Sequence, residues 1–141
     1  MNQTPTQRLP HNPADRGTAD RRRLAEQLWD VVDGREILSP AKFIEMMDMG
    51  IDSFSRDARV HRSTVIRAPA AESIQSHIRV SLQVLATLVA ASGGHLQDAI
   101  FRYRNEPLAP FNYKTAESLV AEGRVTDVLN LLESFQAGFV G

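Results

Sequence analysis

Apolar residues recur at helical spacing along most of the chain, and no valine-rich run alternates apolar and polar positions as a half-buried strand would. Prolines and glycines separate the segments that have this spacing. The pattern predicts helices within residues 20–33, 40–49, 51–67, 70–92, 96–103, 116–122 and 125–137. We therefore predict an all-α protein with negligible strand content.

The N-terminal segment differs in composition from the rest of the chain. Residues 1–18 contain three of the seven prolines and almost no apolar side chains, so they cannot offset the entropy lost on ordering. We predict a disordered tail there. The helix that follows ends at Gly34, and its apolar face consists of Leu24, Leu28, Val31 and Val32. The three arginines at its start, residues 21–23, form either a solvated face or a phosphate-contacting arm.

Residues 51–67 have the spacing of two short helices that cross steeply and share a small core, as in a helix-turn-helix unit. The residues that would form this core are Phe54, Ala58, Val60 and Val65. Arg59 stands in the turn, where this motif commonly has glycine, so it must take a positive φ or the turn must differ. Pro69 ends the second helix early.

The second of these helices would direct outward side chains of the types that contact phosphates or base edges. The candidate DNA-binding residues are Arg59, Arg62, Ser63, Thr64 and Arg67. Residues 52–67 hold four arginines and two aspartates, a local charge of +2 that favours a phosphate partner. The alternative is a helical hairpin of the core whose arginines are solvated.

The longest predicted helix, residues 70–92, contains no glycine or proline in its interior. Its main apolar stripe is Ile74, Ile78, Leu82, Leu85 and Val89, and a second stripe is Val80, Val84, Thr87 and Ala91. We expect this helix to be buried on two sides. It would join a helical N-terminal half, residues 19–92, to a small C-terminal half, residues 95–141.

The C-terminal half has closely spaced breaks. A helix over residues 96–103 is stopped by Asn105-Glu106-Pro107, and Thr115 offers a hydroxyl that can cap the next short helix. Gly123 ends that helix. The final helix has an apolar stripe of Val125, Val128, Leu129, Leu132 and Phe135, and Gly138 frees the last four residues from helical geometry.

This half resembles the C-terminal toxin-binding domain of Xre/MbcA/ParS-type antitoxins. The residues that carry the resemblance are Arg104-Asn105-Glu106-Pro107-Leu108, Thr115, Leu119, Val120, Glu122-Gly123, Val128, Leu132 and the terminal Gly138-Phe139-Val140. The outline covers residues 40–141, and the strong part is 96–141. This chain departs from the family at three positions: Phe101 or Tyr103 replaces the usual tryptophan, Asn112 a frequent glycine, and Ala116 the usual proline.

The resemblance implies that the chain binds a RES-domain toxin, an enzyme that consumes NAD, and covers its nucleotide pocket. The toxin-binding residues it implies are Arg102, Arg104, Asn105, Pro107, Lys114, Thr115, Gly138, Phe139, Val140 and Gly141. Phe139 and Val140 would be the plug, because burying both in a partner could contribute a few kcal/mol. Residues 106–141 have five acids and two bases, a local charge of −3 that suits a basic cleft. The family also has a helix-turn-helix-like N-terminal half.

Composition narrows the possible functions. The chain has 141 residues with 43% hydrophobic content, enough for a single core. It has no cysteine, and its four histidines lack metal-ligand spacing, so we expect no metal and no cofactor. No apolar run reaches the length of a membrane span and the first residues are polar, so we expect a cytoplasmic protein that does not enter a membrane.

The sequence shows no nucleophile with a base, no carboxylate pair and no phosphate-binding loop, so we do not expect an enzyme. Two functions remain. The chain is predicted to be the antitoxin of a type II toxin–antitoxin pair, repressing its own operon through operator DNA and acting as a homodimer within a hetero-oligomer. The alternative is a stand-alone helix-turn-helix transcriptional regulator whose C-terminal half mediates dimerisation.

Overall fold

The computed structural model describes the backbone of residues 13–138 and the side chains of residues 17–136. Within this part of the chain it has 8 α-helices, one short 3₁₀ helix and one two-stranded hairpin. In chain order the elements are α1 (Pro13–Leu28), β1 (Trp29–Val32), β2 (Arg35–Leu38), α2 (Pro40–Met47), α3 (Ile51–Ala58), α4 (Arg62–Arg67), α5 (Glu72–Ala91), α6 (Leu96–Asn105), η1 (Ala109–Phe111), α7 (Ala116–Ala121) and α8 (Val125–Gly138). The predominance of helix agrees with the prediction.

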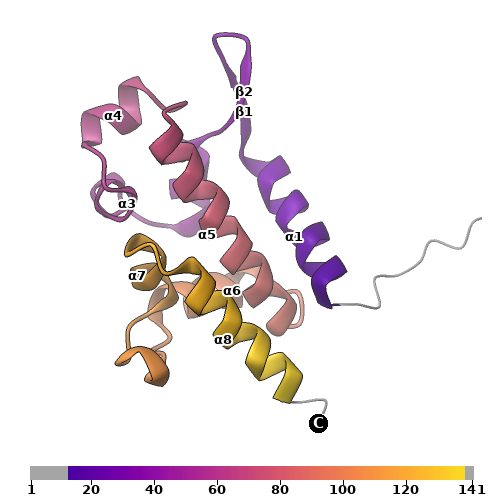
Figure 1. Cartoon of the computed structure of the whole chain (residues 1–141). Coiled ribbons are helices and arrows are strands. Elements are labelled where there is room, and N and C mark those ends of the chain that lie inside the picture. The colour runs from indigo at the N-terminus through magenta and orange to yellow at the C-terminus, as the bar shows by residue number, and fades with distance from the viewer. Residues whose placement is uncertain (1–12, 139–141) are drawn as a thin grey trace, which may run out of the picture.

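The long helix α5 is the central element. It runs through the middle of the molecule, and α1, α6 and α8 all pack against it (Figure 1). The predicted main stripe is buried along its whole length, and its members are Ile74, Ile78, Leu82, Leu85 and Val89. The second stripe is buried only in part, since Val84 is fully covered and Ala91 is exposed. The prediction of a long central helix is thus confirmed, and its burial on two sides is confirmed for the main stripe and only in part for the second.

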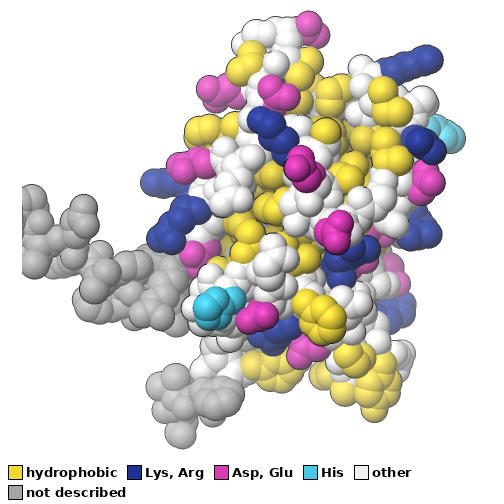
Figure 2. Space-filling model, turned by 180° about the vertical axis from the view of Figure 1, so that it is seen from behind, with side chains coloured by type: hydrophobic (Ala, Val, Ile, Leu, Met, Phe, Trp, Pro, Cys, Tyr) yellow, Lys and Arg dark blue, Asp and Glu magenta, His cyan; other side chains and the backbone are white. Residues whose placement is uncertain are grey.

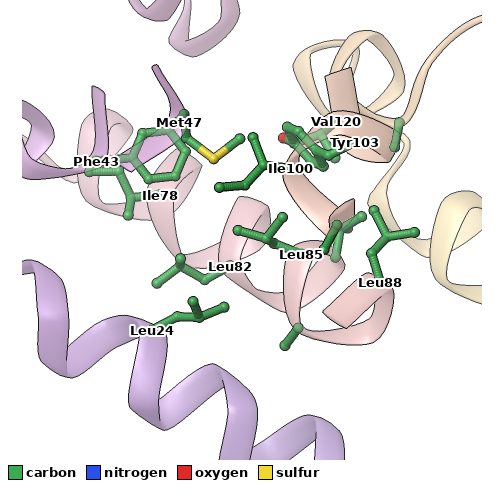
Figure 3. Close-up of a cluster of buried hydrophobic side chains, with 14 of the residues drawn as sticks. Leu24, Phe43, Met47, Ile78, Leu82, Leu85, Leu88, Ile100, Tyr103 and Val120 are labelled. Atoms are coloured by element: carbon green, nitrogen blue, oxygen red, sulfur yellow. The ribbon is translucent and has the colours of Figure 1, made fainter. Parts of the chain in front are cut away.

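A single hydrophobic cluster fills the space around α5. Leu24 of α1 approaches Leu82 of α5, and toward the other end of the cluster Tyr103 of α6 lies beside Val120 of α7 (Figure 3). Each of these four side chains is at most 5% exposed. The predicted N-terminal and C-terminal halves therefore share one continuous core.

The two-stranded hairpin corrects the prediction of negligible strand. β1 and β2 pair antiparallel, with Trp29 opposite Leu38 and Val32 opposite Arg35. The turn between them is Asp33-Gly34, and both residues have positive φ, 51° and 75°. A two-residue Asp-Gly loop with positive φ at both positions matches the right-handed twist of the strands it joins. The helix predicted up to Gly34 is therefore wrong beyond Leu28, and Val31, assigned to its apolar face, is 62% exposed.

Helix α5 anchors the base of this hairpin. The buried side chain of Gln75 accepts a hydrogen bond from Leu38 N and donates one to Leu38 O, each 2.9 Å long. Its amide also donates to Pro69 O, at 2.8 Å. On the other strand, Lys42 Nζ donates to Trp29 O at 2.7 Å. Polar side chains thus satisfy backbone groups at the outer edges of both strands, where an unpaired strand would otherwise attract other chains.

The first helix begins earlier than predicted. α1 starts at Pro13, so residues 13–18 of the predicted disordered tail are helical, while residues 1–12 lie outside the described part of the chain. Proline suits a first helical turn, where its missing N–H has no partner to lose. Downstream, Leu24 and Leu28 are buried as predicted.

The predicted breaks after Asn105 and at Gly123 are confirmed, whereas Gly138, predicted to leave helical geometry, is the last residue of α8. α6 ends at Asn105, and Thr115 Oγ1 accepts a hydrogen bond from Ser118 N at 3.2 Å, which caps α7. Gly123 has a φ of 80° after α7. α8 buries Val128 and Leu132, but Phe135, predicted on the same stripe, is 49% exposed, because α8 extends beyond the helices that cover its first turns (Figure 1).

No single helix in the described part of the chain has both the length and the hydrophobicity of a membrane span, although α5 and α6 would meet that test together, with a bend of 119° between them.

Candidate functional site

The turn between α3 and α4 has the first of the two conformations that the sequence left open, a positive φ at Arg59. Arg59 takes a left-handed conformation, φ 58° and ψ 43°, and its N–H bonds to carbonyls at the end of α3. Its Nε donates to Ala121 O in α7 at 3.1 Å. This bond holds Arg59 against the C-terminal half, so of the candidate DNA-binding residues it is the least free to reach a phosphate.

Helix α4 presents the other candidate DNA-binding residues to different degrees. Arg62, Ser63 and Arg67 are exposed, whereas Thr64 is partly covered. Arg62 Nη1 lies 3.5 Å from Asp52 Oδ1, and both side chains are largely in solvent, so this ion pair is weak and exchangeable. α4 therefore offers two arginines and a serine on one short surface helix.

Arg104 connects the C-terminal half to the N-terminal half. Its Nη1 donates to the carbonyls of Met47 and Asp48, at 3.3 and 3.0 Å, at the end of α2. Its Nε lies 3.2 Å from Glu117 Oε2 in α7, an ion pair without hydrogen-bond geometry. Arg104 therefore joins three elements of the fold.

Two acidic groups share the space between α3 and α7. Burial raises the pKa of Asp57 on α3 and of Glu117 on α7, and their mutual repulsion raises the pKa of Glu117 further. The arginines 56 and 104 act in the opposite direction on both carboxyls. Asp57, Glu117 and Arg56 border a cleft of about 470 Å³ between the two helices.

Three more of the implied toxin-binding residues also make contacts within the chain. Arg102 bonds to Glu106 Oε2 at 2.8 Å and to Ser92 Oγ at 3.2 Å, which ties α6 to the end of α5. Lys114 Nζ bonds to Glu122 Oε1 at 2.7 Å. Thr115 is the cap of α7. Asn105 and Pro107, in contrast, are exposed, although Asn105 Nδ2 donates to the carbonyl one turn back, at Phe101.

The loop between α6 and α7 is closed on itself by backbone hydrogen bonds. Leu108 N donates to Lys114 O at 2.9 Å, and Leu108 O accepts from Phe111 N and Tyr113 N, each also at 2.9 Å. The Leu108 side chain is 5% exposed and anchors the loop in the core. The loop is thus a compact, fixed turn that includes η1.

Two consecutive residues of this loop have unusual backbone conformations. Asn112 and Tyr113 have φ angles of 56° and 63°. Asparagine tolerates this region, but for a bulky residue it is a genuine outlier. The Tyr113 side chain is 70% exposed, and Phe101 on the neighbouring helix α6 is 67% exposed. Hydrophobic side chains gather at the lower end of the molecule, which the C-terminal half forms (Figure 2).

A groove that the sequence did not suggest lies between α1, the hairpin and α5. It has a volume of about 730 Å³, and its walls include Arg21, Arg22, Arg79 and the half-exposed Trp29. Arg79 is ion-paired with Glu72. Two of the three N-terminal arginines, Arg21 and Arg22, thus line a groove and do not lie on a fully open face. The groove could not be predicted from the sequence, because it forms only where β1 places Trp29 beside α1.

The predicted plug, Phe139 and Val140, lies beyond the end of α8. Gly138 is the last residue of α8, and Phe139, Val140 and Gly141 lie outside the described residues. Among the residues that the structure does describe, no group of three potential metal ligands comes together.

Comparisons of the chain with protein-family models, with curated proteins and with solved structures found no match.

Proposed function

We propose that this protein is the antitoxin of a type II toxin–antitoxin pair and that it neutralises a NAD-consuming RES-domain toxin by covering the toxin's active site. The observation that carries the proposal is the loop after α6. In the family that the sequence resembles, the position of Asn112 is often glycine, and Asn112 has a φ of 56°, in the region that glycine favours. The loop conformation thus suits the family motif even where the residue type differs.

The implied toxin-binding residues fall into two groups in this proposal. Asn105, Pro107 and Lys114 are exposed and would contact the toxin directly. Arg102, Arg104 and Thr115 are only partly exposed, and they would instead fix the shape of that surface through the bonds of their side chains within the chain. Backbone positioned in this way needs little ordering on binding, which favours affinity.

Inhibition would follow from occlusion by the end of the chain. The five acids and two bases of residues 106–141 complement a cleft that binds an anionic dinucleotide. Phe139 and Val140 would enter that cleft, and Gly138 would let the chain turn into it.

Co-expression with the product of the adjacent gene tests the proposed function. We expect the adjacent protein alone to stop growth and lower cellular NAD, and we expect both effects to disappear when this chain is co-expressed and co-purifies with it. An adjacent protein that is harmless, or that fails to co-purify, would contradict the proposal.

Deleting residues 138–141 tests the occlusion. We expect the shortened protein to keep its helical circular dichroism spectrum and any DNA binding, since Leu132 is the last buried side chain among those that the structure describes, but to lose most of its protection. A matched variant with Phe139 and Val140 changed to serine keeps the chain length. Full protection by the shortened protein at native expression level would move the inhibitory surface to the loop between α6 and α7.

We also propose that the pair represses its own operon through α4. Two short helices joined by a turn of three residues, Arg59, Val60 and His61, fit a helix-turn-helix unit, and α4 exposes Arg62 and Arg67. The same exposed arginines favour the second candidate function, a stand-alone transcriptional regulator. Operator binding without toxin capture in the co-expression experiment would support that second function.

A further inference from the structure

We infer that Tyr113 is a specificity-determining contact for the toxin, presented to it by a strained turn. The inference rests on the proposed function, since the toxin is the partner it names. It assigns a role to a residue that the sequence motif does not contain.

The backbone of Tyr113 is strained. Tyr113 follows Asn112 in a pair of left-handed residues, with φ values of 56° and 63°. A non-glycine residue in this region costs free energy and persists only where the surrounding structure imposes it. Here the constraint is the bonded loop, in which Tyr113 N donates to Leu108 O and Leu108 N donates to Lys114 O.

The side chain of Tyr113 points into solvent. The turn keeps the Tyr113 ring 70% exposed, so within the described part of the chain its strain is not offset by burial of the ring. An exposed tyrosine has few torsions to lose, and it combines a large apolar face with one hydroxyl, which makes it a frequent anchor of protein interfaces. A ring held outward by a closed loop is already positioned for a partner.

Other exposed apolar residues belong to the same part of the chain as Tyr113. Phe101, 67% exposed, lies on α6 one turn before the loop, and Pro107, Ala109 and Pro110 are exposed around the loop itself. The partner that fits is therefore a protein with an apolar recess for the tyrosine ring and a mostly uncharged rim around that recess. The toxin is the occupant to which we commit, because Tyr113 lies in one loop with Pro107 and Lys114, the exposed residues that the proposed function assigns to the toxin contact.

The test uses the full-length chain and three variants. Tyr113→Gly removes the ring and relieves the backbone strain, Tyr113→Asn removes the ring with a residue that tolerates this φ, and Asn112→Gly relieves strain next door while keeping the ring. Each protein is titrated by calorimetry against the purified product of the adjacent gene, and its Tm is measured alone.

We expect both Tyr113 variants to keep or raise the Tm yet bind the toxin about tenfold more weakly or worse, whereas Asn112→Gly binds like the wild type. Equal binding by the wild type and both Tyr113 variants would overturn the inference and leave the proposed function standing. An equal loss of toxin affinity in Asn112→Gly would also overturn the inference, because binding would then depend on the loop conformation and not on the tyrosine ring. If the wild type itself fails to bind, the proposed function fails, and the inference fails with it.

Discussion

His77 on α5 packs edgewise against two aromatic rings. Its ring centroid lies 6.5 Å from that of Phe43 and 5.5 Å from that of Phe54, with interplanar angles of 75° and 76°. Burial lowers the pKa of His77 from 6.5 to about 4. In this environment the neutral imidazole acts as part of the core.

The buried imidazole predicts acid sensitivity. The folded pKa lies below the unfolded value, so the unfolded state binds the proton more readily and acidification favours unfolding. The contribution of His77 to the free energy of unfolding should be fully present above pH 6.5. It should fall as the pH drops toward 4, by about 3 kcal/mol in total. Denaturant titrations of the wild type and of His77→Phe from pH 7 to 4 measure this loss.

The comparison of the two proteins isolates His77. Asp57 and Glu117 have raised pKa values, so the folded state holds their protons more tightly and they favour folding as the pH falls, but they are present in both proteins. Parallel pH profiles for the wild type and the variant would show that His77 is not the sensitive group.

Arg62 and Arg67 carry the predicted DNA contact. Both are exposed on α4, and a guanidinium fork can grip a guanine edge or a phosphate. Changing both to alanine should abolish a gel shift on the protein's own promoter. The matched control changes Arg21 and Arg22, which line the groove between α1 and α5. If the Arg21 and Arg22 variant loses the gel shift while the Arg62 and Arg67 variant keeps it, the groove and not α4 binds the DNA.

At the scale of elements, the hairpin depends on one side chain of α5. Gln75 makes three hydrogen bonds to backbone groups, at Leu38 N, Leu38 O and Pro69 O, and is 7% exposed. An isolated two-stranded hairpin is at best marginally stable in water. The contacts at its base therefore keep β1 and β2 formed.

Gln75→Ala should detach the hairpin. Leaving the buried N–H of Leu38 without a partner costs about 1–3 kcal/mol, so the free energy of unfolding should fall by that amount. Hydrogen exchange of residues 29–38 should accelerate more than that of α6. Gln83→Ala, at an exposed position of the same helix, serves as the control. Unchanged exchange in the hairpin would show that the pairing of the strands is sufficient without Gln75.

At the scale of the whole molecule, the predicted halves behave as one unit. Arg104 links α6 to the end of α2, Arg59 links the turn after α3 to α7, and the hydrophobic cluster is continuous. A ligand on one half thus acts on a surface that is bonded to the other. This arrangement would give the proposed toxin capture and the proposed DNA binding a physical route by which each could affect the other.

The shared core predicts that residues 1–94 do not fold alone. This fragment would lose buried side chains that each contribute about 1.5–3 kcal/mol, against a total stability of about 5–15 kcal/mol. The lost side chains are Ile100, Tyr103, Leu108, Leu119, Val120, Val128 and Leu132. Calorimetry should show one transition for the full chain and none for the fragment. A cooperative transition of the fragment would mean that the N-terminal half is an independent domain.

The sequence alone determined the features that depend on neighbouring residues. The central helix followed from the spacing of Ile74, Ile78 and Leu82, and the break after Asn105 and the cap at Thr115 followed from local chemistry. The positive φ of Arg59 is one of the two alternatives that the sequence left open, because the helix-turn-helix motif commonly has glycine at that position. Such features involve residues a few positions apart, and their energies hardly change with the rest of the fold.

The tertiary structure decided what depends on distant residues. Asp33-Gly34 is a local turn signal, but the spacing of Leu24, Leu28 and Val31 also fits a continuous helix. The bonds of Gln75 to Leu38, which lies 37 positions away, favour the hairpin. Arg104 was assigned to a partner from its place in a motif, yet it bonds to carbonyls more than 50 residues away. A guanidinium has five donors, and only the folded chain determines which acceptors come within their reach.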